Sequence, residues 1–112
     1  NTIAPFSGRG FTWNNQFIKP DLVAPGVNIT SCAPGGGYEQ RSGTSMATPF
    51  VTGCASLLME WGILMENDLF LYGEKLRAYL INGVKPLPGF DTYPNPQTGW
   101  GALCLYNSIF SR

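Results

Sequence analysis

The longest regular pattern of hydrophobic and polar positions covers residues 46–61. Most positions are apolar or small, and polar side chains recur at every fourth residue: Thr48, Thr52, Ser56 and Glu60. A helix that is apolar nearly all round is typical of a protein interior, so the pattern predicts a buried central helix. Pro49 is expected in the first turn, where its missing N–H costs little. Gly53 is expected to let another backbone approach, and Gly62 to end the helix in the left-handed conformation.

Shorter apolar stretches, interrupted by Gly and Pro, precede this helix. Residues 2–6, 21–26, 27–32 and 38–41 are predicted to form strands, with a Gly-rich turn at residues 34–37. No lysine follows the three glycines of this turn at the spacing of a phosphate-binding loop. This argues against nucleotide binding.

The C-terminal half predicts two further helices. Residues 74–82 place apolar side chains on one face, and Gly83 can close that helix. Residues 85–98 contain four prolines and are predicted to form a surface loop, and residues 103–110 a short terminal helix. Strands before a central helix, followed by more helices, favour the α/β class. No internal repeat divides the 112 residues.

The composition limits the partners. Hydrophobic residues make up 44% of the chain and charged residues only 12%, so much of the surface is expected to be covered, by the chain itself or by sequence outside it. Seven Lys and Arg balance seven Asp and Glu, which favours neither a nucleic-acid nor an anionic-membrane partner. No uninterrupted apolar run approaches the roughly 18–20 residues of a membrane span.

The cysteines and carboxylates do not form a recognisable metal pattern. Cys32, Cys54 and Cys104 are odd in number and lack CxxC spacing, which argues against a zinc site and a complete disulfide framework. We expect them to be small buried apolar residues. No carboxylates have the spacing of calcium ligands, so neither a metal nor another cofactor is expected.

The candidate chemistry lies at the start of the predicted central helix, in residues 43–49 (GTSMATP). The first N–H groups of a helix lack partners and carry partial positive charge. The hydroxyl of Ser45 lies at that position, and its own N–H can donate to an oxyanion. Gly43 removes side-chain bulk beside the reacting carbon. The simpler alternative is that Thr44 or Ser45 only caps the helix.

A serine nucleophile needs a base to accept its proton, and the chain contains no histidine. Ser-Lys pairs are an alternative. However, Lys19, Lys75 and Lys85 all lie far from Ser45 in the sequence, and we assign none of them as the base. The chain is therefore expected to be the nucleophile-bearing part of a larger catalytic domain.

Four segments carry a resemblance to a known family. Residues 43–53 (GTSMATPFVTG) closely resemble the nucleophile motif of the subtilisin-like serine peptidases, the subtilases. Residues 6–10, 19–27 and 99–101 are similar, in order, to the family's Arg-Gly segment, its strand before the active-site loop and its closing Gly-aromatic-Gly. The sequence from residues 72–75 to residues 93–96 resembles that of subtilases of clostridial type, some of which act in spore germination.

The resemblance implies a three-layer α/β domain with a mostly parallel sheet, of which residues 1–112 are the C-terminal fragment. Ser45 would attack the peptide carbonyl of a protein or peptide substrate. The partner Asp, His and oxyanion Asn would belong to the N-terminal remainder of the domain, and Asp21 and Asp68 are not candidates for the Asp. Gly43, Thr44, Ser42 and Arg41 would lie beside the substrate, the last two on the leaving-group side. An extracellular or spore-associated location is implied.

Two other functions are compatible with the residues. A pseudoprotease would keep the fold and bind a protein or small ligand, and an independent structural domain would leave the serine motif as a coincidence. The fragment alone is expected to be inactive and, because a severed sheet leaves an open edge, to self-associate or to have low stability.

Overall fold

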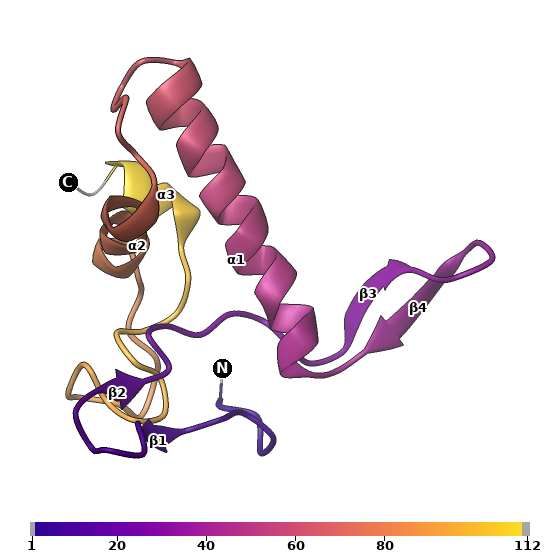
Figure 1. Cartoon of the computed structure of the whole chain (residues 1–112). Coiled ribbons are helices and arrows are strands. Elements are labelled where there is room, and N and C mark those ends of the chain that lie inside the picture. The colour runs from indigo at the N-terminus through magenta and orange to yellow at the C-terminus, as the bar shows by residue number, and fades with distance from the viewer. Residues whose placement is uncertain (1, 111–112) are drawn as a thin grey trace.

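The structure is a computed structural model, and it describes residues 2–110. Figure 1 shows a long helix with a hairpin extending from its start, and two shorter helices beside its far half. The elements in order are β1 (Gly10–Phe11), β2 (Ile18–Lys19), β3 (Ile29–Cys32), β4 (Tyr38–Arg41), α1 (Thr44–Met59), the π-helix η1 (Glu60–Leu64), α2 (Gly73–Asn82) and α3 (Leu105–Phe110).

Helix α1 confirms the predicted central helix, but it does not end at Gly62. The chain continues without a break through η1, and the N–H of Met65 donates to the Glu60 carbonyl at 3.0 Å. The left-handed residue is Glu66, with φ 63°. Gly62 has a packing role instead, because a Cβ there would lie 2.7 Å from Leu71 Cδ2.

The expectation that α1 is buried is wrong for this chain. Leu58 is its only buried residue, whereas Phe50 is 41% and Leu57 50% exposed. Gly53 faces open space, since within residues 2–110 no atom beyond its own stretch of helix lies within 4 Å of the position of a Cβ there. The environment that would bury this helix is therefore not provided by residues 2–110.

By length and composition alone, the 21-residue segment Thr44–Leu64 could cross a membrane, with a mean hydropathy of 1.2. This differs from the expectation drawn from uninterrupted apolar runs. The core helix of a soluble protein satisfies the same criterion, so the finding carries little weight.

The polar stripe of α1 bonds to its own backbone. The hydroxyls of Thr48, Thr52 and Ser56 each donate to the carbonyl four residues earlier, at 2.9–3.1 Å, a pattern that satisfies the side chain locally. Pro49 is the sixth helical residue rather than a first-turn residue. The Ser45 carbonyl consequently lacks the N–H that a regular helix would offer it.

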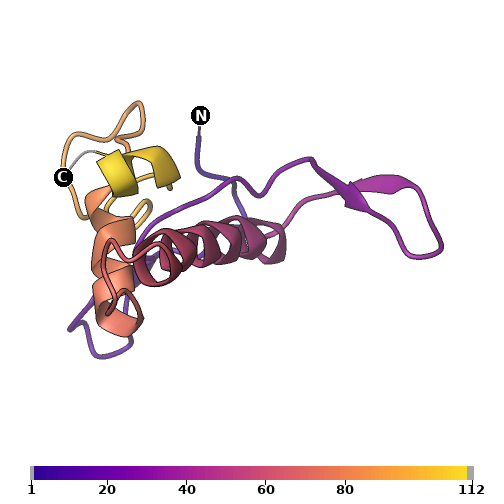
Figure 2. The same cartoon turned by 90° about the horizontal axis from the view of Figure 1, so that it is seen from above.

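The described strands form two small antiparallel pairs, and the three-layer parallel sheet is not seen within them. β3 and β4 form a hairpin that confirms the strands predicted over 27–32 and 38–41, with Cys32 opposite Tyr38 beside the Gly-rich turn. β1 pairs with β2. The strand predicted at residues 2–6 is wrong, because this segment lies outside any strand and turns at Pro5. Figure 2 shows the β3–β4 hairpin projecting away from the helices.

The segment predicted as a strand at 21–26 forms a single parallel bridge, between Val23 and Ala102. Ala102 also bridges Lys85 in the antiparallel direction. Two glycines allow this close approach. A Cβ at Gly99, which has φ 58°, would collide with the backbone of Pro20 and Asp21, and one at Gly101 would lie 2.5 Å from the Lys85 carbonyl oxygen.

The core lies where α1 faces α2 and α3. Leu58, Leu71, Tyr79 and Leu80 form its buried cluster, in agreement with the predicted α2 face. Helix α3 confirms the terminal helix, and it packs against the end of α2 so closely that a Cβ at Gly83 would meet Ser108. Of the cysteines, Cys32 is exposed, contrary to expectation, and Cys54 and Cys104 are half-buried.

The turn between η1 and α2 is organised around Asp68. Its carboxylate accepts hydrogen bonds from Lys75 Nζ at 2.8 Å and Tyr79 Oη at 2.8 Å, and from the N–H of Phe70 at 3.2 Å. These bonds, that of Lys75 first, hold the pKa of Asp68 below its ordinary value. The carboxylate thereby joins the turn to the first two turns of α2.

The glycine contacts predict opposite effects of two Gly→Ala changes. Gly99→Ala should lower the free energy of unfolding by about 2–5 kcal/mol, since left-handed backbone costs a side chain about 1–2 kcal/mol and overpacking adds about 1–3 kcal/mol. Gly53→Ala should raise it by up to about 1 kcal/mol, the helix-propensity difference. Urea unfolding followed by tryptophan fluorescence measures both, and equal losses would contradict the packing described.

Asp68→Asn is expected to lower the melting temperature at pH 7. Because the folded-state pKa is lowered, the stabilisation by the carboxylate is present above the unfolded value of about 3.9 and is lost as pH falls through the folded value. The difference between the variant and the original protein should therefore shrink below pH 4 in thermal melts. Asp91→Asn, at an exposed position, is the control and should leave the melting temperature unchanged both at pH 7 and below pH 4.

Candidate active site

Ser45 is the second residue of α1 and is exposed. Its hydroxyl makes no hydrogen bond with any other residue in the described range 2–110, and neither does its backbone N–H. At a helix N-terminus, where the peptide dipoles give a partial positive charge, this leaves an open donor beside an open hydroxyl.

The structure argues against a capping role for this serine. The N-cap is Gly43, which has no side chain to cap the helix, and Thr44 and Ser45 both lie inside the helix. The Thr44 carbonyl accepts the Thr48 hydroxyl. The first turn therefore has no side-chain cap, and its leading N–H groups remain available to a ligand.

The helix start is held against the loop at Gly26. The N–H of Gly43 donates to the Gly26 carbonyl at 2.8 Å, and the N–H of Met46 donates to the Gly43 carbonyl at 3.0 Å. A Cβ at Gly26 would lie 2.8 Å from the Gly43 carbonyl oxygen and 3.3 Å from Ala47 Cβ. Gly26 thus fixes the position of Ser45, a role that sequence reasoning missed although Pro-Gly at 25–26 marked a turn.

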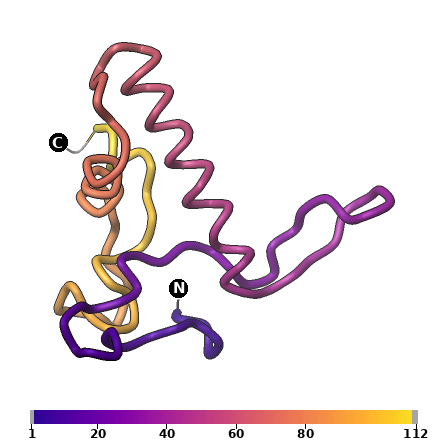
Figure 3. The backbone as a smooth tube through the Cα atoms, viewed as in Figure 1, coloured from indigo at the N-terminus to yellow at the C-terminus, as the bar shows by residue number. Residues whose placement is uncertain are grey.

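Ser42 closes the base of the hairpin. Its Oγ accepts the N–H of Asn28 at 2.8 Å, and Asn28 adopts φ 54°, a left-handed conformation that Asn tolerates. Figure 3 follows the backbone past the start of α1, out along the hairpin and back. Arg41 pairs with Glu39 at 2.6 Å, and its side chain is 58% exposed.

The predicted site residues are therefore consecutive, from the end of β4 into the first turn of α1. Gly43 and Thr44 also border a cavity of about 910 Å³, whose lining does not include Arg41, Ser42 or Ser45. Whether Arg41 and Ser42 contact the leaving group of a substrate stays a prediction.

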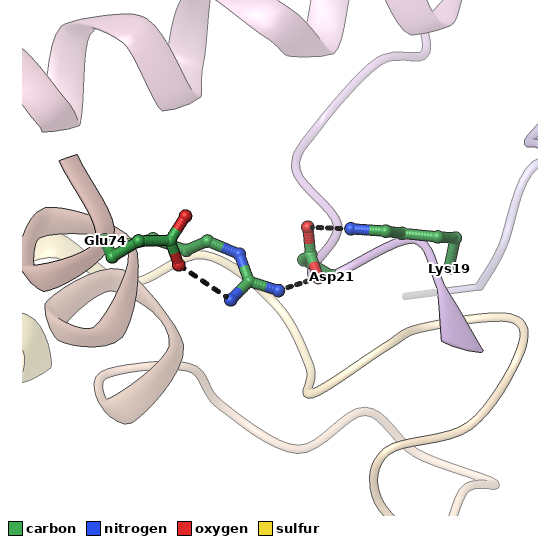
Figure 4. A network of polar contacts seen from close by, with 4 residues as sticks. Lys19, Asp21 and Glu74 are labelled. Atoms are coloured by element: carbon green, nitrogen blue, oxygen red, sulfur yellow. Dashed lines mark hydrogen bonds and ion pairs between the residues drawn. The ribbon is translucent and has the colours of Figure 1, made fainter. Parts of the chain in front are cut away.

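The carboxylates discussed above, with Lys19 and Lys75, are engaged elsewhere. Asp21 accepts from Lys19 Nζ at 2.9 Å and from Arg77 at 2.6 Å, and Arg77 lies 3.6 Å from Glu74 (Figure 4). Burial acts to raise the pKa of Asp21, but the hydrogen bonds from Lys19 and Arg77 outweigh it and lower that pKa. The Asp21 carboxylate in turn raises the pKa of Arg77. This network joins β2 to α2.

Within residues 2–110, Ser45 thus offers an unpartnered hydroxyl and an unpartnered N–H, and no base lies hydrogen-bonded to it. No lysine hydrogen-bonds Ser45 within residues 2–110, and the sequence has no histidine. Three or more potential metal-ligating side chains do not gather anywhere in that range.

Comparisons with known proteins identify relatives of this chain. A sequence profile of the subtilase family, Peptidase_S8, matches residues 1–101. The minor extracellular protease Vpr of Bacillus subtilis is 32% identical over 96% of this chain, and an intracellular serine protease of Paenibacillus polymyxa is 46% identical over 73% of it. This chain spans 14% and 25% of their lengths, respectively.

The solved structure of the Clostridium perfringens CspB protease superposes with a TM-score of 0.91, at 50% identity over 97% of this chain, and the chain spans 23% of that protein. The patellamide maturation protease PatA superposes at 0.61, with 32% identity. These neighbours confirm the α/β protease class. The described strands are short and do not form the predicted three-layer parallel sheet, which stays a prediction. The chain belongs to the subtilase family of serine proteases and resembles its clostridial type.

Proposed function

We propose that Ser45 is the nucleophile of a subtilisin-like serine endopeptidase, and that this chain is the C-terminal, nucleophile-bearing portion of its catalytic domain. One observation carries the proposal most directly. An exposed hydroxyl lies at an uncapped helix N-terminus beside an N–H, and neither group has a hydrogen-bond partner within residues 2–110. Membership of the subtilase family supports the reaction class.

In this mechanism, Ser45 Oγ attacks the carbonyl carbon of the scissile peptide bond, and its proton passes to a base. The developing oxyanion accepts a hydrogen bond from the Ser45 N–H, which needs no reorientation because the first turn of α1 already fixes it. The base returns the proton to the leaving amine, giving an acyl-enzyme that water then hydrolyses.

The base, the residue that orients it and the second oxyanion donor belong to the remainder of the domain, by the family resemblance. Members of a triad act as a unit, and removing one typically lowers kcat by several orders of magnitude. The 112-residue chain alone is therefore inactive in this account. Its partners are the remainder of the catalytic domain and a protein or peptide substrate.

The exposed stripe on α1 supports a larger domain independently of the chemistry. Phe50, Gly53 and Leu57 follow helical spacing and are all exposed. A glycine inside a helix costs up to about 1 kcal/mol relative to alanine, and nothing in the described chain approaches it closely enough to need one. A close neighbour from outside this chain would explain it.

A fluorophosphonate probe tests the nucleophile. The longer polypeptide that carries this sequence with its preceding catalytic-domain segment should be labelled, and Ser45→Ala should abolish labelling, because it removes the oxygen that attacks phosphorus and displaces fluoride. Ser56→Ala is the matched control, because that serine lies on the same helix and bonds its own backbone. The 112-residue chain alone should not be labelled.

Two results would contradict this assignment: labelling that survives Ser45→Ala, or no labelling of a longer polypeptide whose thermal melt shows it to be folded. The second result would favour a pseudoprotease of the same fold.

A further inference from the structure

The loop between β1 and β2, with the strand residue that enters it, carries three exposed aromatic side chains. Trp13 is 96% exposed, Phe17 61% and Phe11 56%. A single exposed apolar residue needs no explanation, but several close together mark an interaction surface. Residues 11–17 (FTWNNQF) are therefore a candidate binding surface, which we call the aromatic loop.

Hydrogen bonds hold the aromatic loop in one shape. The N–H of Thr12 donates to the Phe17 carbonyl at 2.9 Å, and the N–H of Asn15 donates to the Thr12 carbonyl at 2.7 Å. Asn14 Oδ1 accepts the Thr12 hydroxyl at 2.6 Å and the N–H of Gln16 at 3.2 Å. Because the turn is already ordered, little backbone freedom remains to be lost when a ligand binds to it.

The base of the aromatic loop is fixed to the rest of the chain, away from the candidate active site. β1 pairs with β2 below the loop, and the N–H of Gly10 donates to the Pro96 carbonyl at 2.8 Å. Figure 1 shows β1 and β2 well apart from the start of α1. A ligand on the aromatic loop is therefore not the peptide bond that Ser45 attacks.

The polar groups of the aromatic loop indicate the chemistry of its ligand. The amide nitrogens of Asn14, Asn15 and Gln16 have no hydrogen-bond partner within residues 2–110. The indole N–H of Trp13 has none there either. A side-chain amide offers both donors and an acceptor, as the hydroxyls of a ligand do, and residues 10–18 contain no charged side chain. These groups suit an uncharged ligand that is rich in hydroxyls.

A sugar ring combines an apolar face with such hydroxyls. A pyranose ring whose hydroxyls are all equatorial carries only axial C–H groups on its two faces, and its hydroxyls surround the rim. The C–H groups can pack on the negative face of an aromatic ring, while the rim hydroxyls exchange hydrogen bonds with amide side chains. The pairing of Trp13 with the neighbouring amides offers both contacts on one short turn.

Two other classes of partner fit the aromatic loop less well. At about 150–250 Å² for each whole side chain, the exposed parts of the three aromatic residues offer roughly 300–550 Å². One partner in a standard protein–protein interface contributes about 800 Å². Insertion into lipid would remove the three amide side chains from water without giving them a partner, which is unfavourable.

We propose that the aromatic loop binds an uncharged polysaccharide of pyranose units with equatorial hydroxyls. Trp13 is the platform on which a sugar ring stacks, and the amides of Asn15 and Gln16 bind its hydroxyls. The proposal goes beyond the peptidase reaction, and it does not require Ser45 to be the nucleophile.

NMR titration of the longer polypeptide that carries this sequence tests the site. The probes are cellohexaose and chitohexaose, the β-1,4-linked hexamers of glucose and of N-acetylglucosamine. The indole N–H signal of Trp13 should shift saturably with at least one of them, and those of Trp61 and Trp100 should stay in place.

Three results of this titration would overturn the proposal. The first is the absence of a shift at Trp13 with either sugar. The second is an indole N–H of Trp13 that exchanges slowly with solvent before sugar is added, because the rest of the polypeptide would then cover the loop. The third is a shift with phosphatidylcholine vesicles but not with the sugars, which would assign the loop to a lipid surface.

Calorimetric titration of variants with the sugar that binds separates stacking from general stickiness. Trp13→Ala should raise the dissociation constant about tenfold or more, because it removes the aromatic face, and Trp13→Phe, with a smaller ring, should fall between. Tyr38→Ala is the matched control, since this aromatic side chain is 77% exposed on the other hairpin, and it should bind as the original protein does. Equal affinities of Trp13→Ala and Tyr38→Ala, in samples with unchanged thermal melts, would contradict the site.

Discussion

The close backbone contact between residues 20–23 and 99–103 is the constraint on which the arrangement of this chain depends. The N–H of Trp100 donates to the Asp21 carbonyl at 2.8 Å, and Val23 forms its parallel bridge two residues further along. Only glycine at position 99 fits against the Pro20 and Asp21 backbone. Figure 1 shows the result, with the C-terminal loops lying against the N-terminal segment.

This contact determines where the nucleophile candidate lies. From Val23 the chain runs only a few residues to Gly26, whose carbonyl holds the N–H of Gly43. Ser45 follows two residues later, at a helix start that has no side-chain cap. The ion pairs from Asp21 to Lys19 and Arg77 fix the same segment to β2 and α2. The start of α1 is therefore positioned by the contacts of the segment before it, and the N–H of Ser45 has no partner within residues 2–110.

The sequence predicted the elements that depend on local signals. The recurrence of polar side chains at every fourth residue of 46–61 identified α1, and the Gly-rich turn at 34–37 marked the β3–β4 hairpin. The predictions that proved wrong concern features that depend on tertiary contacts. Burial of α1 and Cys32 requires atoms packed around them, and Gly62 serves the approach of Leu71 rather than a helix end. The segments at 2–6 and 21–26 have strand-like residues, but a strand also needs a neighbour to pair with.

In the candidate site, too, local signals could be predicted from the sequence and tertiary contacts could not. The motif at 43–53 indicated Ser45 from its residue types and spacing, and the structure removed the alternative of a cap. The bonds of Gly26 and Ser42 could not be predicted, because each joins residues at least 14 positions apart whose approach depends on the hairpin between them. A histidine base could not be predicted within this chain, because the sequence contains no histidine.

The central claim is that Ser45 becomes a nucleophile through a base supplied from outside this chain. The pH dependence of fluorophosphonate modification at Ser45, located by mass spectrometry in the longer polypeptide, tests it most directly. The account predicts a rate that rises with an apparent pKa near that of a histidine, about 6.5, and then reaches a plateau. A rate that keeps rising in proportion to hydroxide up to pH 9, as for an unassisted hydroxyl, would contradict it.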